Sequence, residues 1–354
     1  MKEKIKKVGI FTINDDGNFG NRLQNYAVQE ILKKYNMQVT TIRKNNLIGR
    51  IKSKLKTSIK KVLSQNKYKR QVNFCRFNKN IKFKYYKKDK DLEKINKQYN
   101  YFIAGSDQIW NPNFGRMSDI DFLTFADNKK RISFSASFGV EKLPDNLEIF
   151  YKERLQNFKS ISVREDAGKE IVKSLTKRED IEVLIDPTML LEAKEWDKVA
   201  KVPKKVPKKK YILNYFLGNI SDERKNEIDS IAKENNCEII NILEINDPYY
   251  CSGPSEFLYL EKNAFLICTD SFHSSVFAII YNRPFIIFER EDKNVKMNSR
   301  IKTLIRKFKL KDREFNYKIT DENLKHDYTE AYQILDNERE KSIEFLKKAL
   351  EIKK

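Results

Sequence analysis

A histidine stands directly after one of the apolar runs of the chain. The sequence holds two histidines, His273 and His326, so a reaction step that needs an imidazole has two candidates. His273 follows the run Ala264–Thr269 and precedes a predicted helix, whereas His326 lies in a polar stretch. An imidazole at a strand end can donate a hydrogen bond to a phosphate or act as a general acid. His273 is therefore a candidate catalytic residue, with a satisfied structural histidine as its alternative, and His326 is expected to be solvated.

Two arginines occupy positions where they could hold an anion. Arg164 follows the apolar run Ser160–Val163 and precedes a predicted helix, whose first N–H groups could bind the same anion. The alternative for Arg164 is an ion pair with Glu165 or Glu170. Arg300 stands at a predicted helix start, with an ordinary exposed arginine as its alternative. The planar guanidinium matches carboxylates and phosphates, so we predict both arginines as anion-binding residues.

Strands and helices must alternate to position these residues. Short apolar runs predict buried parallel strands, and the amphipathic stretches between them predict helices. Two alternating halves flank the segment Val202–Lys208, whose two prolines predict an extended linker. We therefore expect an α/β protein with one Rossmann-like domain in residues 1–200 and a second in residues 201–330. A helix in residues 331–354 is expected to pack back on the first domain.

The positive charge of the chain is concentrated in two segments. The formal net charge is +21, from 71 basic and 50 acidic residues. Residues 50–90 contain 16 Lys or Arg and one acid, and residues 201–210 contain six Lys and no acid. The first segment is either a solvated face or a surface for anionic lipid headgroups, with a stripe of Ile51, Leu55 and Ile59 partly inserted. Nucleic-acid binding is not expected, because no recognisable binding module is present.

Several protein classes are excluded by simple patterns. Four cysteines without a CxxC pair predict free thiols, with neither a disulfide framework nor a zinc site. No apolar run approaches the ~18 residues of a membrane-spanning helix, and Val8–Ile13 is too short for a signal-peptide core. No Walker loop, GxGxxG or GxSxG motif occurs. We therefore expect a cytoplasmic protein without a metal, and the basic segment leaves peripheral attachment to the inner membrane face open.

Seven short motifs follow predicted strands or begin predicted helices in a fixed order. They are residues 17–27 (GNFGNRLQNYA), 105–112 (GSDQIWNP), 135–139 (SASFG), 162–165 (SVRE), 186–188 (DPT), 269–274 (TDSFHS) and 298–301 (NSRI). This series, from about Val8 to Arg313, resembles the polysaccharide pyruvyl transferase family. The resemblance implies a glycosyltransferase-B-like pair of Rossmann-like domains facing a cleft. It also implies transfer of a pyruvyl group from phosphoenolpyruvate to sugar hydroxyls, which forms a ketal and releases phosphate.

The resemblance implies a donor site formed mostly by the second half of the chain, together with Arg164 from the first half. Phosphoenolpyruvate would be the co-substrate and no further cofactor is expected. His273 would protonate the methylene carbon of the donor while a sugar oxygen attacks the neighbouring carbon. Many family members carry an arginine where this sequence has Ser271, so Arg300, Arg283 or Arg22 would have to supply that cation. The predicted donor-binding residues are Arg164, Arg300, Ser271 and Ser274.

The resemblance also implies an acceptor side in the first half of the chain. Asp107 is a candidate general base for a sugar hydroxyl, with a helix cap as its alternative. Trp110 is a candidate for stacking on a sugar, with the hydrophobic core as its alternative. Ser135 either binds ligand or ends a strand. The other predicted acceptor-binding residues form a polar rim after the first strand, namely Asn18, Asn21, Arg22 and Gln24.

The resulting prediction is a pyruvyl transferase of surface polysaccharide assembly. Its partners would be phosphoenolpyruvate and a saccharide acceptor, either polymeric or lipid-linked. Two alternatives remain at this point: a glycosyltransferase with a nucleotide-sugar donor, and a sugar- or anion-binding protein without catalysis. The fold prediction is the firmer inference, because one fold can host many functions.

Overall fold

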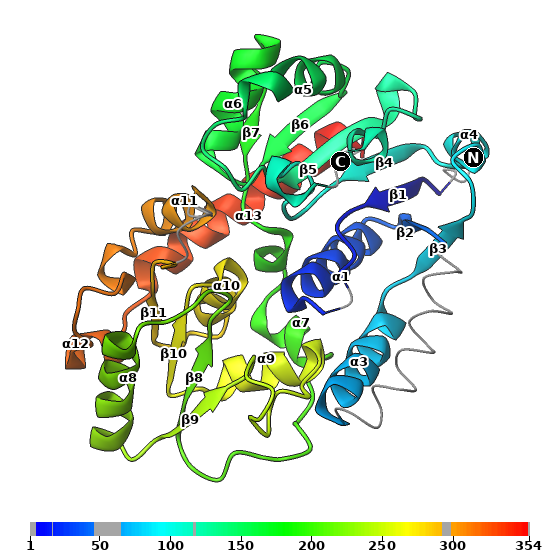
Figure 1. The fold of residues 1–354 in the computed structure, drawn as a ribbon. Coiled ribbons are helices and arrows are strands. Elements are labelled where there is room, and N and C mark those ends of the chain that lie inside the picture. The colour runs from blue at the N-terminus through cyan, green and yellow to red at the C-terminus, as the bar shows by residue number, and fades with distance from the viewer. Residues whose placement is uncertain (1–4, 16, 46–64, 116–117, 292–298, 353–354) are drawn as a thin grey trace. The chain divides into compact units, whose positions relative to one another are not determined.

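The computed structural model describes residues 5–15, 17–45, 65–115, 118–291 and 299–352 (Figure 1). The chain forms two compact units. Unit 1 comprises Met1–Ile51, Lys79–Leu190 and Asp336–Lys354, and unit 2 comprises Lys52–Asn78 and Leu191–Leu335. The division differs from the predicted domains, because the boundary between the two halves lies after residue 190 rather than 200 and because the described residues 65–78 belong to unit 2.

Unit 1 is built on a parallel sheet of seven described strands. Their order, β3-β2-β1-β4-β5-β6-β7, reverses direction at β1, as in a doubly wound sheet. Side chains on both faces of the central strands are buried, so these strands read as continuous apolar or small-residue runs. The strands are β1 (Lys7–Phe11), β2 (Gln38–Lys44), β3 (Phe83–Tyr86), β4 (Tyr101–Ala104), β5 (Arg131–Ala136), β6 (Ser160–Val163) and β7 (Glu182–Val183).

The helices of unit 1 connect successive strands of this sheet. Helix α1 begins after Asn18, whose side chain accepts a hydrogen bond from the backbone N–H of Asn21. The end of the C-terminal helix also belongs to unit 1, where Phe345 stacks on Phe134 and Leu346 is fully buried. The helices are α1 (Phe19–Lys34), α4 (Asp91–Gln98), α5 (Glu148–Leu155), α6 (Asp166–Thr176) and the C-terminal part of α13 (Thr329–Ala349).

Unit 2 contains a parallel sheet of four described strands in the order β11-β10-β8-β9. The order reverses between β8 and β10, and ligands of open α/β sheets bind at such a switch point, beyond the carboxyl ends of the strands. Its core joins the strands to α8 through Ile212, Ile228, Leu266 and Ile286. The strands are β8 (Tyr211–Tyr215), β9 (Glu238–Asn241), β10 (Leu266–Thr269) and β11 (Phe285–Ile287).

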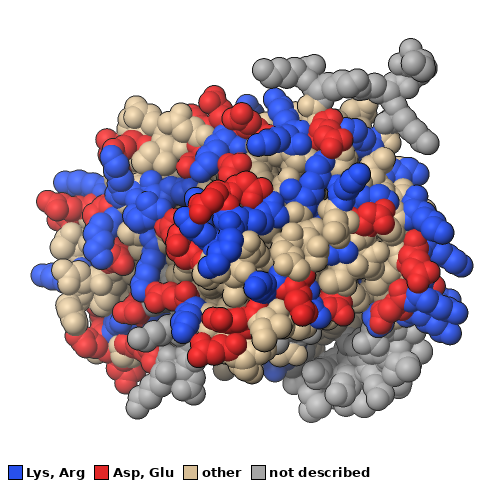
Figure 2. Space-filling model, turned by 90° about the horizontal axis from the view of Figure 1, so that it is seen from above, with Lys and Arg blue, Asp and Glu red and all other residues tan. Residues whose placement is uncertain are grey.

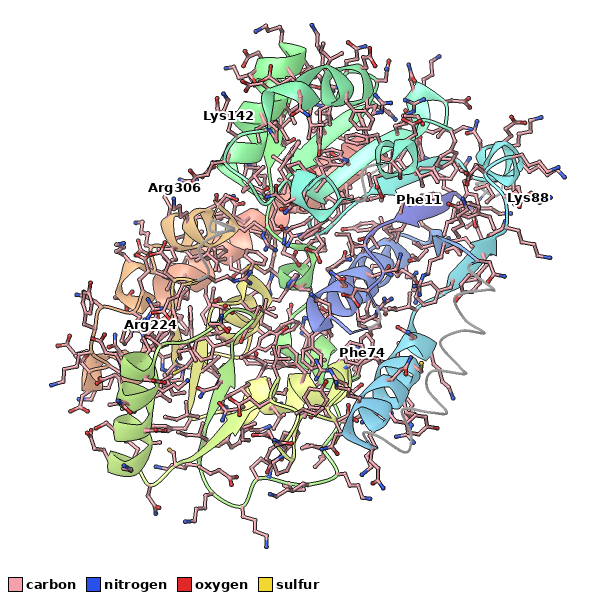
Figure 3. The ribbon with its side chains drawn as sticks, in the orientation of Figure 1. Phe11, Phe74, Lys88, Lys142, Arg224 and Arg306 are labelled. Atoms are coloured by element: carbon pink, nitrogen blue, oxygen red, sulfur yellow. The ribbon has the colours of Figure 1, made fainter. Side chains whose placement is uncertain are left out.

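The helices of unit 2 include one from the basic segment of the sequence. Arg70 and Asn73 of α3 donate hydrogen bonds to the carbonyl oxygens of Tyr250 and Cys251, both at 2.9 Å. Phe74, labelled in Figure 3, is fully buried. The helices are α3 (Gln65–Phe77), α7 (Ala193–Asp197), α8 (Asp222–Glu234), α9 (Pro254–Asn263), α10 (Phe272–Ile280), α11 (Ser299–Phe308), α12 (Asp321–Leu324) and the start of α13.

The basic segment is only partly described. The predicted stripe of Ile51, Leu55 and Ile59 lies outside the described residues. On the face in Figure 2, blue basic side chains and red acidic ones are interspersed. Among the described helices, none is both long enough and apolar enough to cross a bilayer.

Replacing Gly253 by alanine should destabilise the protein. A Cβ atom at Gly253 would lie 2.7 Å from the backbone carbon of Asn73, so α3 would have to shift. Overpacking of this kind costs about 1–3 kcal/mol, which urea-induced unfolding measures directly. The matched change Gly17→Ala meets no atom closer than 3.5 Å, and it should alter the unfolding free energy by less than about 0.5 kcal/mol. Equal effects of the two changes would contradict the packing of α3 in unit 2.

Candidate functional site

A buried ionic cluster lies at the carboxyl edge of the unit 1 sheet. Arg164, directly after β6, places Nη1 3.0 Å from Oδ2 of Asp186 and Nη2 3.6 Å from Oδ1 of Asp107. The same guanidinium donates a hydrogen bond of 2.9 Å to Ser106, whose hydroxyl donates to Asp186 at 3.2 Å. The Arg164 side chain is 1% exposed. The alternative of a surface ion pair does not describe this side chain, which is buried and paired with Asp186 and Asp107. Its predicted role in donor binding stays a prediction.

The predicted acceptor residues of α1 face the interior of unit 1. The amide of Asn21 donates to the carboxylate of Asp107, and Gln24 donates to the hydroxyl of Thr12 at 2.8 Å. Arg22 is fully buried and donates to the carbonyl oxygen of Asp15. In this structure these three side chains form an internal network rather than an open rim, because α1 packs its polar face against the strand ends. Asn18 alone of the four is half-exposed.

Trp110 and Ser135 are also internal. The Trp110 ring stacks on Phe122 with a centroid separation of 5.7 Å, and its Nε1 donates to the carbonyl oxygen of Asp121. Ser135 donates to the carbonyl oxygen of Ile185 at 2.8 Å. Trp110 is therefore a core residue here, and Ser135 links the ends of two neighbouring chain segments. Their contact with an acceptor sugar remains a prediction.

A second polar cluster lies at the carboxyl edge of the unit 2 sheet and contains His273. Ser271 is the N-cap residue of α10, so His273 lies in the first turn of that helix. The His273 ring lies 5.4 Å from the ring of Phe272, and the guanidinium of Arg300 lies 5.5 Å from the same ring. Both polar side chains are buried, with 7% and 6% exposure. The Phe272 ring is thus close both to an imidazole and to a cation from the first turn of α11.

Asp270 organises this edge, a role that the sequence analysis did not assign. Its two carboxylate oxygens each accept a backbone N–H at 2.7 Å, from Leu217 and Gly218 in the loop after β8. Arg290, after β11, forms an ion pair with Asp270 at 3.1 Å. The motif TDSFHS contained Asp270, but a carboxylate that binds backbone N–H groups from a distant loop has no local sequence signal.

Ser274 is bound to a buried acid that the sequence analysis also missed. Its hydroxyl donates to Oε1 of Glu261, on α9, at 2.6 Å, and both side chains are fully buried. Burial raises the pKa of Glu261 well above its ordinary value, and the hydrogen bond from Ser274 only partly opposes this shift. The carboxyl group is therefore neutral at pH values where exposed glutamates are ionised.

The cation expected near Ser271 has two candidates among the described residues. Arg300 is beside Phe272, and Arg290 is paired with Asp270. Arg283 precedes β11 and so lies at the amino edge of the parallel sheet, opposite His273. Arg22 belongs to the unit 1 network. Arg283 and Arg22 therefore do not replace the missing arginine within unit 2. Among the described residues, no group of three or more His, Cys, Asp or Glu side chains is arranged to hold a metal ion.

Asp186→Asn should destabilise the protein strongly. The change removes the negative charge that pairs with buried Arg164, and breaking a buried pair costs about 3–5 kcal/mol. Asp180→Asn provides a matched control, because Asp180 pairs with Arg178 but is 62% exposed. Urea-induced unfolding should show a loss of at most about 1 kcal/mol for the control. Similar losses in both variants would show that the Arg164 cluster is not a buried ionic centre.

Glu261→Gln should stabilise the protein progressively as the pH rises. Below about pH 4.5 the side chain is protonated in both folded and unfolded states, so it adds no pH-dependent penalty. Above that pH the unfolded chain ionises first, because the folded-state pKa is raised, and the wild type loses stability. The loss amounts to about 1.4 kcal/mol for each pH unit between the two pKa values. Melting temperatures at pH 5 and pH 8 should therefore diverge between the two proteins, and parallel curves would contradict a neutral buried Glu261.

The comparisons with known proteins agree with the fold and with the motifs. Two solved structures match nearly the whole chain at low identity. A glycosyltransferase from Rickettsia africae is 12% identical with a TM-score of 0.50, covering 98% of this chain and 99% of its own. The S. aureus MnaA–UDP co-structure is 11% identical with a TM-score of 0.51, covering 99% and 98%. These likenesses show the fold, which is the glycosyltransferase-B-like α/β fold that the motifs implied.

The sequence comparison identifies the family. No curated protein matches the chain. The model of the polysaccharide pyruvyl transferase family matches residues 18–292, which includes six of the seven predicted motifs except for one residue, Gly17. The match covers most of the chain and includes both clusters described above, apart from Arg300. The chain belongs to the polysaccharide pyruvyl transferase family and is a transferase.

Proposed function

We propose that this protein transfers the pyruvyl group of phosphoenolpyruvate to two hydroxyls of a saccharide, with the donor bound at the carboxyl edge of unit 2. The observation that carries the proposal is the placement of His273 and Arg300 close to the ring of Phe272, each in the first turn of a helix. The family match supports the saccharide acceptor and the transferase class. The donor itself rests on the chemistry of the cluster.

Phosphoenolpyruvate carries a phosphate and a carboxylate, and the cluster offers donors for anions. The first turns of α10 and α11 contain no acidic residue, so no carboxylate within either turn offsets the partial positive charge of the helix N-terminus. Arg300 contributes a planar fork that suits either anionic group. The hydroxyl of Ser299 is buried and has no hydrogen-bond partner among the described residues, so it is available to an anion.

The proposed reaction adds one proton to the methylene carbon of phosphoenolpyruvate and forms two bonds between sugar oxygens and the neighbouring carbon. The imidazole of His273 donates a proton to the methylene carbon, which becomes a methyl group, while the first sugar hydroxyl adds to the neighbouring carbon and gives up its proton. The second hydroxyl then displaces phosphate from that carbon, and its proton leaves with the phosphate or the base. Arg300 and the helix N-termini stabilise the charge on the departing phosphate. Asp107 remains the predicted base for the acceptor.

A nucleotide sugar is the alternative donor. The support for it is the fold shared with the MnaA structure that holds UDP. Lipid linkage of the acceptor and binding of residues 50–90 to an anionic membrane remain predictions from the sequence. Liposome flotation with neutral and anionic lipids tests the membrane prediction, because electrostatic attachment should be confined to anionic vesicles and weaken with salt.

Phosphoenolpyruvate should raise the melting temperature of the wild-type protein, because a ligand of the folded state at 100 times its Kd adds about 2.7 kcal/mol. Arg300→Lys should weaken binding by roughly tenfold, since an ammonium lacks the planar fork. Arg306→Lys is the matched control, because Arg306 is an exposed arginine of the same helix, labelled in Figure 3. The control should bind like the wild type.

His273→Ala should separate catalysis from binding. Loss of a general acid lowers turnover by about 10²–10⁴-fold. The measurement is phosphate release from phosphoenolpyruvate with a saccharide acceptor, beside hydrolysis of a nucleotide sugar as the competing assay. A fully active variant, or turnover of the nucleotide sugar alone, would overturn the proposal.

A further inference from the structure

A hollow of about 560 Å³ opens beside the carboxyl ends of β8 and β9 in unit 2. Its walls come from these two strand ends, from the loop after β8 and from α8, which can be followed in Figure 1. The size is within the range of pockets that hold small organic molecules, and it exceeds the need of a three-carbon acid. The side chains that matter for its chemistry are Asn214, Phe216, Ile220, Asp229, Asn241 and Glu244.

The hollow is tied to the His273 cluster through Asp270. Gly218 lines the hollow, and its backbone N–H donates to Asp270, directly before Ser271. Strands β10, β8 and β9 are consecutive neighbours in the sheet, and their ends are separated by about 4.8 Å per strand. The far wall at β9 is therefore about 10 Å from the end of β10. A short saccharide is long enough to span that distance without leaving unit 2 of the protein.

The charges around the hollow disfavour a phosphate-bearing ligand. Asp229 and Glu244 line it. The lining cation, Lys225, is 3.1 Å from the carboxylate of Asp222 and is thus already paired. Bringing a diphosphate to this acidic surface would cost electrostatic energy. Carboxylates instead accept hydrogen bonds from neutral hydroxyl groups.

The floor and walls suit the two faces of a sugar ring. Asn214 donates to Asn241 at 2.9 Å, and the Oδ1 atom of Asn214 is buried with no hydrogen-bond partner among the described residues. The Asn214 and Asn241 amides therefore give this part of the lining a polar character. Phe216, Ile220 and Ile239 are half-exposed apolar side chains packed on the core of unit 2, and they offer surfaces for C–H groups.

We propose that this hollow binds an uncharged sugar unit of the acceptor chain. The assignment of this sugar to the acceptor rests on the function proposed above. The binding of a neutral sugar rests only on the residues that line the hollow. The sugar held here would be next to the sugar that reacts near His273. The hollow would therefore select acceptor chains by the identity of the sugar that precedes or follows the modified sugar.

The test measures sugar binding without phosphoenolpyruvate. Saturation-transfer NMR of the full chain with methyl β-glucoside, methyl β-galactoside, methyl β-mannoside and N-acetylglucosamine should detect binding of at least one of them. Leu243→Trp fills the hollow and should abolish the signal. Val206→Trp, a change of an exposed aliphatic residue of the same unit that does not line the hollow, should retain it. Excess UDP should not compete.

A second variant, Glu244→Ala, tests the hollow in case Leu243→Trp does not fold. Glu244 is exposed, so Glu244→Ala should keep the wild-type melting temperature and weaken sugar binding about three- to tenfold by removing an acceptor. No binding by any of the four sugars, unchanged binding in Leu243→Trp, or displacement by UDP would overturn the proposal. Phosphate release from phosphoenolpyruvate is measured in a separate assay. If the wild-type protein releases phosphate but binds none of the four sugars, the hollow is not a sugar site and the proposed reaction is unaffected.

Discussion

The functional edge of unit 2 depends on one buried carboxylate. Asp270 stands where the strand order reverses, and it binds the loop after β8 through two N–H groups and the segment after β11 through Arg290. A carboxylate buried this deeply is tolerated because all three partners offer positive charge or partial positive charge. The same contacts fix the wall of the hollow and the start of α10. Asp270 thus holds the loop that lines the hollow, and it directly precedes Ser271, the N-cap residue of the helix that carries His273.

The two units treat their strand-end polar residues differently. In unit 1, Arg164 is paired with Asp186 and Asp107, and Asn21 donates to Asp107, all inside the protein. In unit 2, the first turns of α10 and α11 carry no acid, and the hydroxyl of Ser299 lacks a partner among the described residues. Internal pairing stabilises a unit, whereas helix N-termini without an acid in the first turn are suited to bind an anion. This contrast is the physical reason for placing the donor in unit 2.

Sequence patterns predicted the strands well, because apolar runs are local signals. Strand β10, for example, ends where the motif of His273 begins. Burial of Arg22, Gln24 and Trp110 was not predictable, since polar side chains at a strand end can face a ligand or one another. The membership of α3 in unit 2 and the pairing of Ser274 with Glu261 arise from contacts between segments far apart in the sequence.

The central claim is that unit 2 binds phosphoenolpyruvate between two helix N-termini. The most direct measurement is a crystal structure of the wild-type protein with phosphoenolpyruvate. The account predicts ligand density in which the guanidinium of Arg300 and the N-terminal turn of α10 contact the anionic groups, with His273 beside the methylene carbon. Density bound instead within unit 1 by Arg164, with the unit 2 cluster empty, would contradict it.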